Sequence, residues 1–166
     1  MGLFGSDYCI DTSALIDLRR RKYAPDVFRS LWKQIEELVK SGRIISHQKV
    51  FEELKKLTDK SDNLLKWAKM HKRMFISLDG GQSKNVSKIL EAFPRLVDQN
   101  RETEDADPFV IALAMIENRT VITSEQPANI DVNKNARPKI PDVCKHFKVK
   151  CIYDMLEFFR QEKWEF

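Results

Sequence analysis

Short apolar runs alternate with segments of helical periodicity along most of this 166-residue chain. The periodic segments predict amphipathic helices, the clearest from Phe28 to Val39, with Gly42 where a C-terminal cap belongs. The expected strands are residues 8–10, 43–46, 74–78, 120–123 and 149–153. Parallel strands need crossover connections, and helices in these connections cover both faces of the sheet. The alternation therefore predicts an α/β fold: a single-domain α/β/α sandwich over residues 1–166, with a central, mostly parallel sheet of about five strands.

The composition is that of a globular protein outside the membrane. Hydrophobic residues make up 42% of the chain and charged residues 33%, and no apolar run reaches the roughly 20 residues that a membrane helix needs. Residues 1–6 lack the basic segment and the long apolar core of a secretory signal. Three cysteines without C-x-x-C spacing fit neither a disulfide framework nor a thiolate zinc site. We therefore expect a cytoplasmic protein with reduced cysteines and no membrane contact.

A carboxylate directly follows the first expected strand. Asp11 comes after the apolar run Tyr8–Ile10, and a helical segment begins just beyond it. In an open α/β sheet, ligands bind in the crevice beyond the carboxyl ends of the strands, so Asp11 is expected at the functional edge. The alternative is that Asp11 only caps the helix. Thr12 and Ser13 are the better-placed caps, which favours a role for Asp11 in a site.

Glu53 is a second candidate. The apolar positions between residues 50 and 57 define one face of a predicted helix, and Glu53 lies about a quarter-turn from that face. Glu52 points almost opposite and is expected to be solvated. The alternative for Glu53 is a surface ion pair with Lys49 or Lys56, and this helix alone leaves both interpretations open.

Asp107 opens a predicted helix that is otherwise apolar. The run from Phe109 to Ile116 predicts a helix buried on nearly all sides, so a carboxylate at its start must lie in the interior or in a cleft. A buried charge there needs a cation or hydrogen-bond donors. The alternative is capping, because Asp at the N-cap followed by Pro108 is a good helix start. Asp105 is an alternative cap or an outer metal ligand.

Glu125 comes two residues after Thr123, at the end of an expected strand, in the same arrangement as Asp11. Carboxylates without histidine or cysteine select hard cations such as Mg²⁺ or Mn²⁺. Such a site suits phosphodiester hydrolysis, in which one or two ions orient water and stabilise the leaving oxygen. The candidate catalytic and metal-binding residues are Asp11, Glu53, Asp107 and Glu125.

Two basic clusters flank these acidic positions. Arg19, Arg20, Arg21 and Lys22 follow the helix beside Asp11, and Arg137 lies with other basic residues in the irregular stretch after the fourth carboxylate. The net charge of +4 is compatible with nucleic acid. The alternative is that each cluster is solvated surface. Their common location favours RNA-binding roles for these five residues.

The segments 10–13, 50–54, 107–114 and 121–125 together resemble the PIN domain family, and the resemblance covers nearly the whole chain. It implies that Asp11, Glu53 and Asp107 correspond to the three core acidic residues of the family. Glu125 would correspond to the fourth, with Thr123 as its accompanying hydroxyl. The resemblance also makes Ser13 a polar residue near the metal.

The PIN resemblance further implies a Mg²⁺- or Mn²⁺-dependent ribonuclease similar to VapC-type toxins, which are usually neutralised by an antitoxin protein and are often homodimers. The sequence departs from the common pattern through a glutamate at position 125 and a proline directly after Asp107. The segment 139–144 resembles a less-characterised prokaryotic branch of the family.

Other phosphate-handling folds fit less well. A phosphatase of the haloacid dehalogenase type needs a second aspartate where this chain has Ser13. Neither G-x-G-x-x-G nor a glycine–lysine phosphate loop is present, which argues against a Rossmann or P-loop protein. The remaining alternative is a non-catalytic module of the same fold that binds nucleic acid or protein through a degenerate site, and Glu125 is its best argument.

Overall fold

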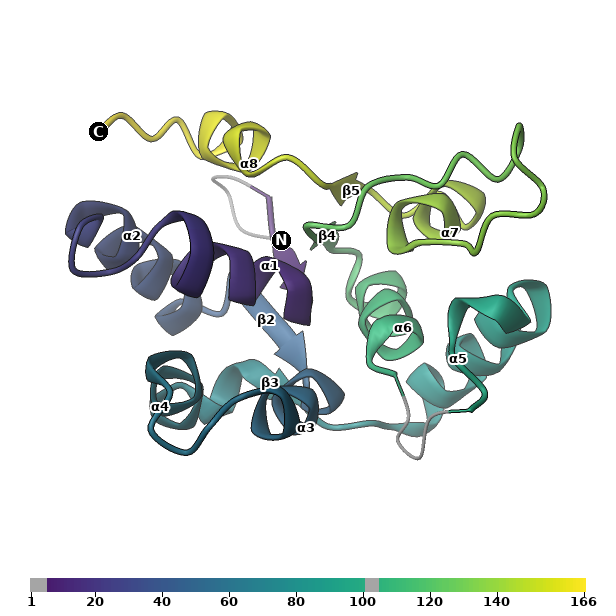
Figure 1. The fold of residues 1–166 in the computed structure, drawn as a ribbon, viewed down its shortest axis with the longest axis horizontal. Helices are drawn as coiled ribbons and strands as arrows, with labels where there is room; N and C mark the ends of the chain where they lie inside the picture. Colours follow the sequence, from purple (N-terminus) through teal and green to yellow (C-terminus); the bar gives the residue numbers. More distant parts are fainter. Residues whose placement is uncertain (1–5, 101–104) are drawn as a thin grey trace.

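The computed structural model describes residues 6–100 and 105–166. Within these ranges, five parallel strands form one sheet in the order β3-β2-β1-β4-β5 (Figure 1). The strands are β1 (Tyr8–Ile10), β2 (Ile44–His47), β3 (Phe75–Ile76), β4 (Thr120–Ile122) and β5 (Cys151–Ile152). The predicted α/β fold with a mostly parallel sheet is confirmed.

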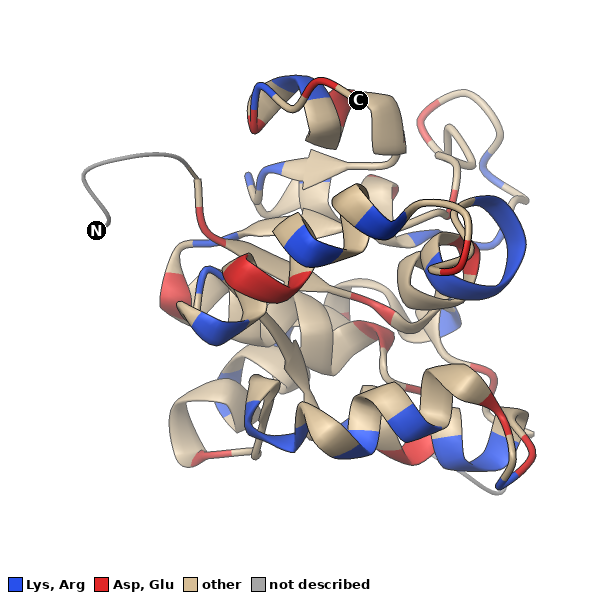
Figure 2. Cartoon of the chain, turned by 90° about the vertical axis from the view of Figure 1, so that its left-hand side faces the viewer, with Lys and Arg blue, Asp and Glu red and all other residues tan. Residues whose placement is uncertain are grey.

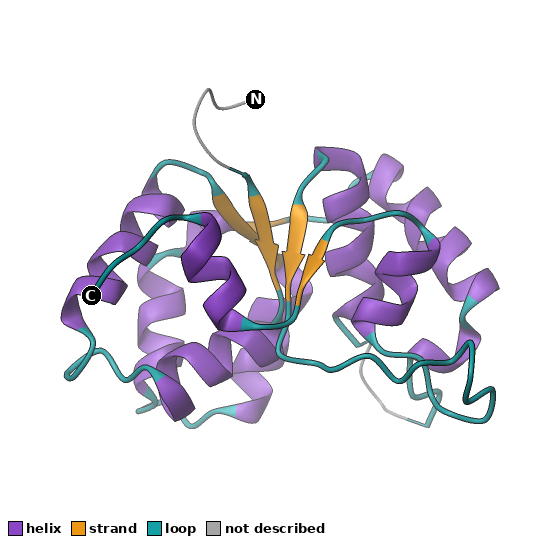
Figure 3. Cartoon of the chain, turned by 90° about the horizontal axis from the view of Figure 1, so that it is seen from above, coloured by secondary structure: helices purple, strands orange, loops and turns teal. Residues whose placement is uncertain are grey.

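Helices cover both faces of the sheet, which forms a thin middle layer in Figure 3. In Figure 1, α5, α6 and α7 lie to the right of the strands, and α2 and α4 lie to the left. The helices are α1 (Thr12–Ile16), α2 (Arg29–Lys40), α3 (Gln48–Leu57), α4 (Asn63–Met70), α5 (Gly80–Ala92), α6 (Asp107–Glu117), α7 (Ile140–His146) and α8 (Met155–Gln161). A π-helical segment η1 (Asp17–Lys22) and two 3-10 turns, η2 (Lys72–Met74) and η3 (Pro94–Leu96), complete the described elements.

The strand order creates a switch point beside β1. The chain builds β2 and β3 on one side of β1 and then returns to add β4 and β5 on the other side. Cys9 pairs with Ile45 of β2 and with Val121 of β4, so the carboxyl ends of these strands lie side by side. A crevice at such a reversal is where open α/β sheets bind ligands.

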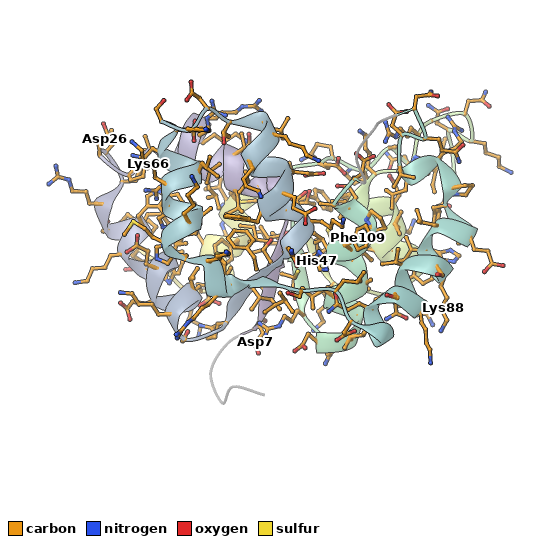
Figure 4. The ribbon with its side chains drawn as sticks, turned by 90° about the horizontal axis from the view of Figure 1, so that it is seen from below. Asp7, Asp26, His47, Lys66, Lys88 and Phe109 are labelled. Atoms are coloured by element: carbon orange, nitrogen blue, oxygen red, sulfur yellow. The ribbon has the colours of Figure 1, made fainter. Side chains whose placement is uncertain are left out.

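Helix α6 runs through the hydrophobic core. Every residue from Pro108 to Ala114 is buried, as predicted, but the predicted buried run extended to Ile116, which is 42% exposed. The imidazole of His47, at the end of β2, lies against the ring of Phe109 with 5.3 Å between ring centroids (Figure 4). This packing fixes the start of α6 near the carboxyl ends of the strands.

Several details differ from the sequence prediction. Strand β5 contains only Cys151–Ile152 of the expected residues 149–153. Strand β3 contains only Phe75–Ile76, because Leu78 is 45% exposed and Asp79 already caps α5 by accepting a hydrogen bond from Gln82 N. Leu57, expected on the buried face of its helix, is 61% exposed because it is the last residue of α3 and lines a pocket instead of the core. No described helix is long and apolar enough to cross a membrane.

Candidate acidic site

A pocket of about 240 Å³ opens at the carboxyl ends of the strands and brings the predicted carboxylates together. Asp11, Glu53, Asp107 and Glu125 all line it, and Asp105 lines it as well. These residues come from the ends of β1 and β4, from α3 and from the start of α6. Positions more than 100 residues apart in the sequence therefore share one cavity, which from here on is called the acidic pocket.

Asp11 is almost completely buried, with 3% of its surface exposed. Its Oδ1 accepts a hydrogen bond from Ala14 N at 2.8 Å, which makes Asp11 the N-cap of α1. The expectation that Thr12 or Ser13 would cap this helix instead is wrong, because Asp11 has the extended backbone that an N-cap requires. The cap uses one oxygen, and Asp11 still lines the acidic pocket.

Two hydroxyl groups hold the Asp11 carboxylate. Thr123 Oγ1 donates to Oδ2 at 2.7 Å, and Ser13 Oγ donates to the same oxygen at 2.9 Å. Thr123 in turn accepts from Glu125 N at 3.1 Å, and Ser13 accepts from Ser124 N at 3.0 Å. These bonds tie the start of α1 to the end of β4, so the carboxylate has a fixed orientation.

Glu53 joins α3 to the neighbouring elements. Its Oε1 accepts from Ala106 N at 2.8 Å, and its Oε2 accepts from the hydroxyl of Thr12. Glu52 lies outside the described lining of the acidic pocket and forms an ion pair with Lys49 at 3.4 Å. Glu53 is therefore held in place by two other elements of the fold.

Asp107 is the first residue of α6, and Ala106 holds the N-cap position. The interpretation that Asp107 caps this helix is wrong, because the helix begins at Asp107 itself and Pro108 is its second residue. No group in the described ranges donates a hydrogen bond to its carboxylate. Asp105 is different, since it accepts from Asp98 N at 3.0 Å and lies 3.6 Å from the guanidinium of Arg137.

Burial and mutual repulsion make two of these carboxyl groups weaker acids. Burial raises the pKa of Asp107 well above its usual range, and repulsion from Glu125, Asp11 and the other pocket carboxylates adds to the shift. Burial also raises the pKa of Asp11 to about 7, although its three kinds of hydrogen-bond donor favour the charged form. A bound cation would relieve the same repulsion.

Glu125 connects β4 to the start of α7. Its Oε2 accepts from Ile140 N at 2.9 Å, the first backbone amide of that helix. The intervening residues 126–139 form the irregular stretch expected from the sequence, and Arg137 and Lys139 from this stretch also line the acidic pocket. Basic side chains therefore stand at the rim of a cavity whose floor is acidic.

Asp142 organises this stretch, although it was not among the residues predicted from the sequence. It is 8% exposed, and its carboxylate accepts from Ala128 N, Asn129 N and Lys139 N at 2.8–3.0 Å. Both ends of the loop are thus fastened to one side chain. Asp142 is the third residue of α7 and follows Pro141. An acidic residue at this position, next to a proline in the first turn, is a signal for a helix start that could have identified it.

The basic run Arg19–Lys22 lies on η1, outside the described lining of the acidic pocket, and appears as a continuous blue stretch of ribbon in Figure 2. Arg19 is held against the rings of Trp32 and Trp67, at 4.5 and 5.3 Å from their centroids. The other members of the run form ion pairs at 3.2–3.3 Å, Arg20 with Asp62 and both Arg21 and Lys22 with Asp17. The predicted RNA contacts thus divide into Arg137 at the pocket and a separate cluster whose members form ion pairs or ring contacts with neighbouring residues.

The donor atoms of the acidic pocket suit a hard cation. All five acidic side chains offer oxygen, and the carboxyl group of Asp107 receives no hydrogen bond from the described residues. Within residues 6–100 and 105–166, however, no three such side chains converge closely enough to form a ready-made coordination shell. Asp11, Glu53 and Glu125 are each held by local hydrogen bonds. Side-chain rotation would therefore accompany metal binding.

Comparison with known proteins gives a family and a fold. A family model described as "Domain of unknown function (DUF4411)" matches residues 8–166. No curated protein matches the sequence. The fold is similar to that in the crystal structure of VapBC2 from Rickettsia felis bound to a DNA fragment from their promoter, with a TM-score of 0.51 and 15% identity over 87% of this chain and 96% of the other. The fold is PIN-like, as the sequence resemblance predicted.

Proposed function

The chain belongs to the DUF4411 family, and we propose that it is a Mg²⁺- or Mn²⁺-dependent endoribonuclease that hydrolyses RNA phosphodiester bonds at the acidic pocket. The observation that carries this proposal is the convergence of Asp11, Glu53, Asp105, Asp107 and Glu125 on one cavity at the switch point of the sheet. Packing alone does not favour so many like charges in one place, because they repel one another.

Asp11, Glu53, Asp107 and Glu125 are the residues proposed to hold the metal, with Asp105 as an outer partner. When bound, such an ion supplies a polarised water for attack on the phosphorus and stabilises the leaving oxygen. Thr123 and Ser13 are positioning residues, because their hydroxyl groups fix the carboxylate of Asp11.

Proton binding and metal binding compete at this site. The pKa of Asp11 is raised to about 7, so part of its population keeps a proton at neutral pH without a cation, and burial and repulsion raise the pKa of Asp107 as well. A divalent ion replaces these protons, and metal affinity is therefore expected to increase with pH.

By analogy with toxins of the VapC type, we propose RNA as the substrate, an antitoxin protein as partner and a homodimer as the assembly. The PIN-like fold shared with VapBC2 supports this extension. Arg137 at the pocket and Arg19–Lys22 at the surface are the proposed RNA contacts. A single PIN-like domain over residues 1–166 and a cytoplasmic location complete the proposal.

One observation favours a second candidate, a non-catalytic binding module. The carboxylates in the described ranges do not form a preassembled metal shell, and Glu125 is tied to Ile140 N. Metal binding would not separate the two candidates, because a degenerate site can still hold an ion. Turnover separates them.

The test is cleavage of a mixed pool of structured RNA by the purified protein with Mg²⁺, with Mn²⁺ or with chelator. We expect metal-dependent cleavage that Asp11→Asn and Asp107→Asn reduce by more than the roughly 10–100-fold that loss of a supporting residue costs. Glu52→Gln is the matched control, since Glu52 lies one residue from Glu53 and outside the described pocket lining. A fully active Asp11→Asn protein contradicts the site, and no cleavage under any condition favours the binding module.

A further inference from the structure

A second cavity, of about 480 Å³, adjoins the acidic pocket. One wall comes from the end of α5 and from η3, and the other comes from the stretch between Glu125 and Ile140. Pro138 lines both cavities. An extended ligand bound at the acidic pocket can therefore continue past Pro138 into the second cavity.

Reciprocal hydrogen bonds join η3 to the loop segment that lies between the two cavities. Arg95 Nη2 donates to Asn135 O at 2.9 Å. Arg137 donates in the other direction, from Nε to Arg95 O at 3.0 Å and from Nη2 to Leu96 O at 2.9 Å. The loop and η3 are thus braced against each other, so the second cavity is formed before a ligand arrives, which lowers the entropy cost of binding.

The charges around this cavity favour an anion. Arg95 and Lys134 both line it and both are exposed. Asp131 lines it as well, but its carboxylate forms an ion pair with Lys145 at 2.9 Å. The cavity therefore has a net positive lining, in contrast to the acidic pocket beside it.

Its remaining walls are apolar. Phe93, Pro94, Ile130 and Pro138 contribute them. The ring of Phe93 is packed edge-on against His146, with 5.0 Å between centroids and 86° between planes, so its orientation is fixed. An apolar wall with a fixed aromatic ring accommodates a nucleobase, and nearby cations accommodate a phosphate.

We propose that this cavity is a nucleotide subsite. It binds the nucleotide of the RNA next to the phosphodiester at the acidic pocket, with the base against Phe93, Pro94 and Ile130 and the phosphate near Arg95 and Lys134. The subsite rests on the proposed ribonuclease function and makes these residues determinants of the cleavage position.

Binding of a fluorescently labelled single-stranded RNA, measured by anisotropy, tests the subsite. All proteins carry Asp11→Asn so that the probe is not cut. We expect the pair Arg95→Ala and Lys134→Ala to weaken binding roughly 10-fold. The matched pair Arg29→Ala and Lys33→Ala removes the same charge from α2 and is expected to change binding less than about two-fold.

A second arm tests the apolar wall without removing a cation. Ile130→Glu introduces a carboxylate into the cavity, and a series of RNAs with one abasic nucleotide each locates the base that the cavity holds. In the protein without the Ile130 substitution, we expect one abasic position to weaken binding several-fold. With Ile130→Glu, that position should no longer differ from its neighbours. Equal thermal stability of all variants shows that they are folded.

The outcomes separate the subsite from the function on which it rests. Equal losses in the two charge pairs, or no sensitive abasic position, overturn the subsite. If the wild-type protein cleaves RNA but Arg95→Ala with Lys134→Ala binds normally, the subsite is wrong and the nuclease stands. If the wild-type protein neither binds nor cleaves RNA, both proposals fall.

Discussion

The two walls of the acidic pocket are built in different ways. On the wall made by the ends of β1 and β4, Asp11 is buried and receives hydrogen bonds from Ala14 N, Ser13 and Thr123. On the opposite wall, Asp107 at the start of α6 receives no hydrogen bond from any described residue, although burial and repulsion raise its pKa strongly. The comparison teaches that the strand ends provide fixed geometry, while the helix start provides a carboxyl group whose ionised form a bound cation would stabilise.

The largest expected effect concerns the pH dependence of the metal-free protein. The pKa of Asp11 is raised from 3.8 to about 7 in the folded state. Between these values the folded protein keeps a proton that the unfolded chain has released, so stability present at low pH is lost as the pH rises through about 7. The loss attributable to this group is on the order of 4 kcal/mol.

Urea unfolding from pH 4 to pH 8 in the presence of chelator measures this dependence. Asp11→Asn is the control, because asparagine can still cap α1 through its carbonyl oxygen but cannot titrate. The difference in unfolding free energy between the two proteins should therefore change with pH. A constant difference across the range would show that Asp11 titrates normally.

The next effect concerns the loop that carries Arg137. Asp142→Ala removes the acceptor of three backbone N–H groups, and we expect a loss of about 3 kcal/mol in unfolding free energy. Cleavage should fall as well, because Arg137 and Lys139 would no longer be held at the rim. Asp154→Ala, which removes the exposed cap of α8, should cost only about 1 kcal/mol and leave activity unchanged. Similar effects of both substitutions would mean that Asp142 is an ordinary helix cap.

A smaller effect is expected when the hydroxyl group of Thr123, which supports Asp11 at the strand ends, is removed. Thr123→Val keeps the shape of the side chain but removes the donor to Asp11 Oδ2. We expect about 1 kcal/mol of destabilisation and roughly 10-fold lower metal affinity. The same substitution at Thr120, at the other end of β4, provides the control in a calorimetric Mn²⁺ titration. Equal metal affinities in the two variants would remove Thr123 from the site.

The smallest effect is a gain in the stability of the protein when Asp107, at the start of α6, is neutralised. Asp107→Asn removes a carboxylate that repels its neighbours when ionised, so the metal-free variant should be as stable as the wild type or more stable by about 1 kcal/mol at alkaline pH. Thermal unfolding with chelator provides the comparison. Marked destabilisation would mean that Asp107 has a structural partner that the described residues do not include.

The sequence predicted the fold well because the relevant signals are local. Strand runs such as Tyr8–Ile10, the helix with its cap at Gly42 and the buried helix α6 all follow from periodicity and capping residues within a single segment. The length of β3 did not follow, because pairing with one neighbour at the edge of the sheet decides where that strand ends.

The sequence predicted that carboxylates from separate elements meet at the strand ends, and these residues do line one pocket, but their contacts were not predicted. Strand-end position and helix position identified the carboxylates, yet the bond from Glu53 to Ala106 N joins residues far apart in the sequence. Asp11 both caps α1 and lines the acidic pocket, and its role as a cap depends on an extended backbone conformation that the residue type does not determine. The packing of Arg19 against two tryptophans likewise required the tertiary structure, since a basic run looks the same when it is solvated.

The most direct test of the central claim is calorimetric titration of the wild-type protein and Asp107→Asn with Mn²⁺ in two buffers of different ionisation enthalpy at pH 7. The account predicts that the wild-type protein binds Mn²⁺ and releases protons, because the ion displaces protons from Asp11 and Asp107. Asp107→Asn should bind far more weakly. Absence of binding, or equal binding by the variant without proton release, would contradict the claim that these carboxylates form a metal site.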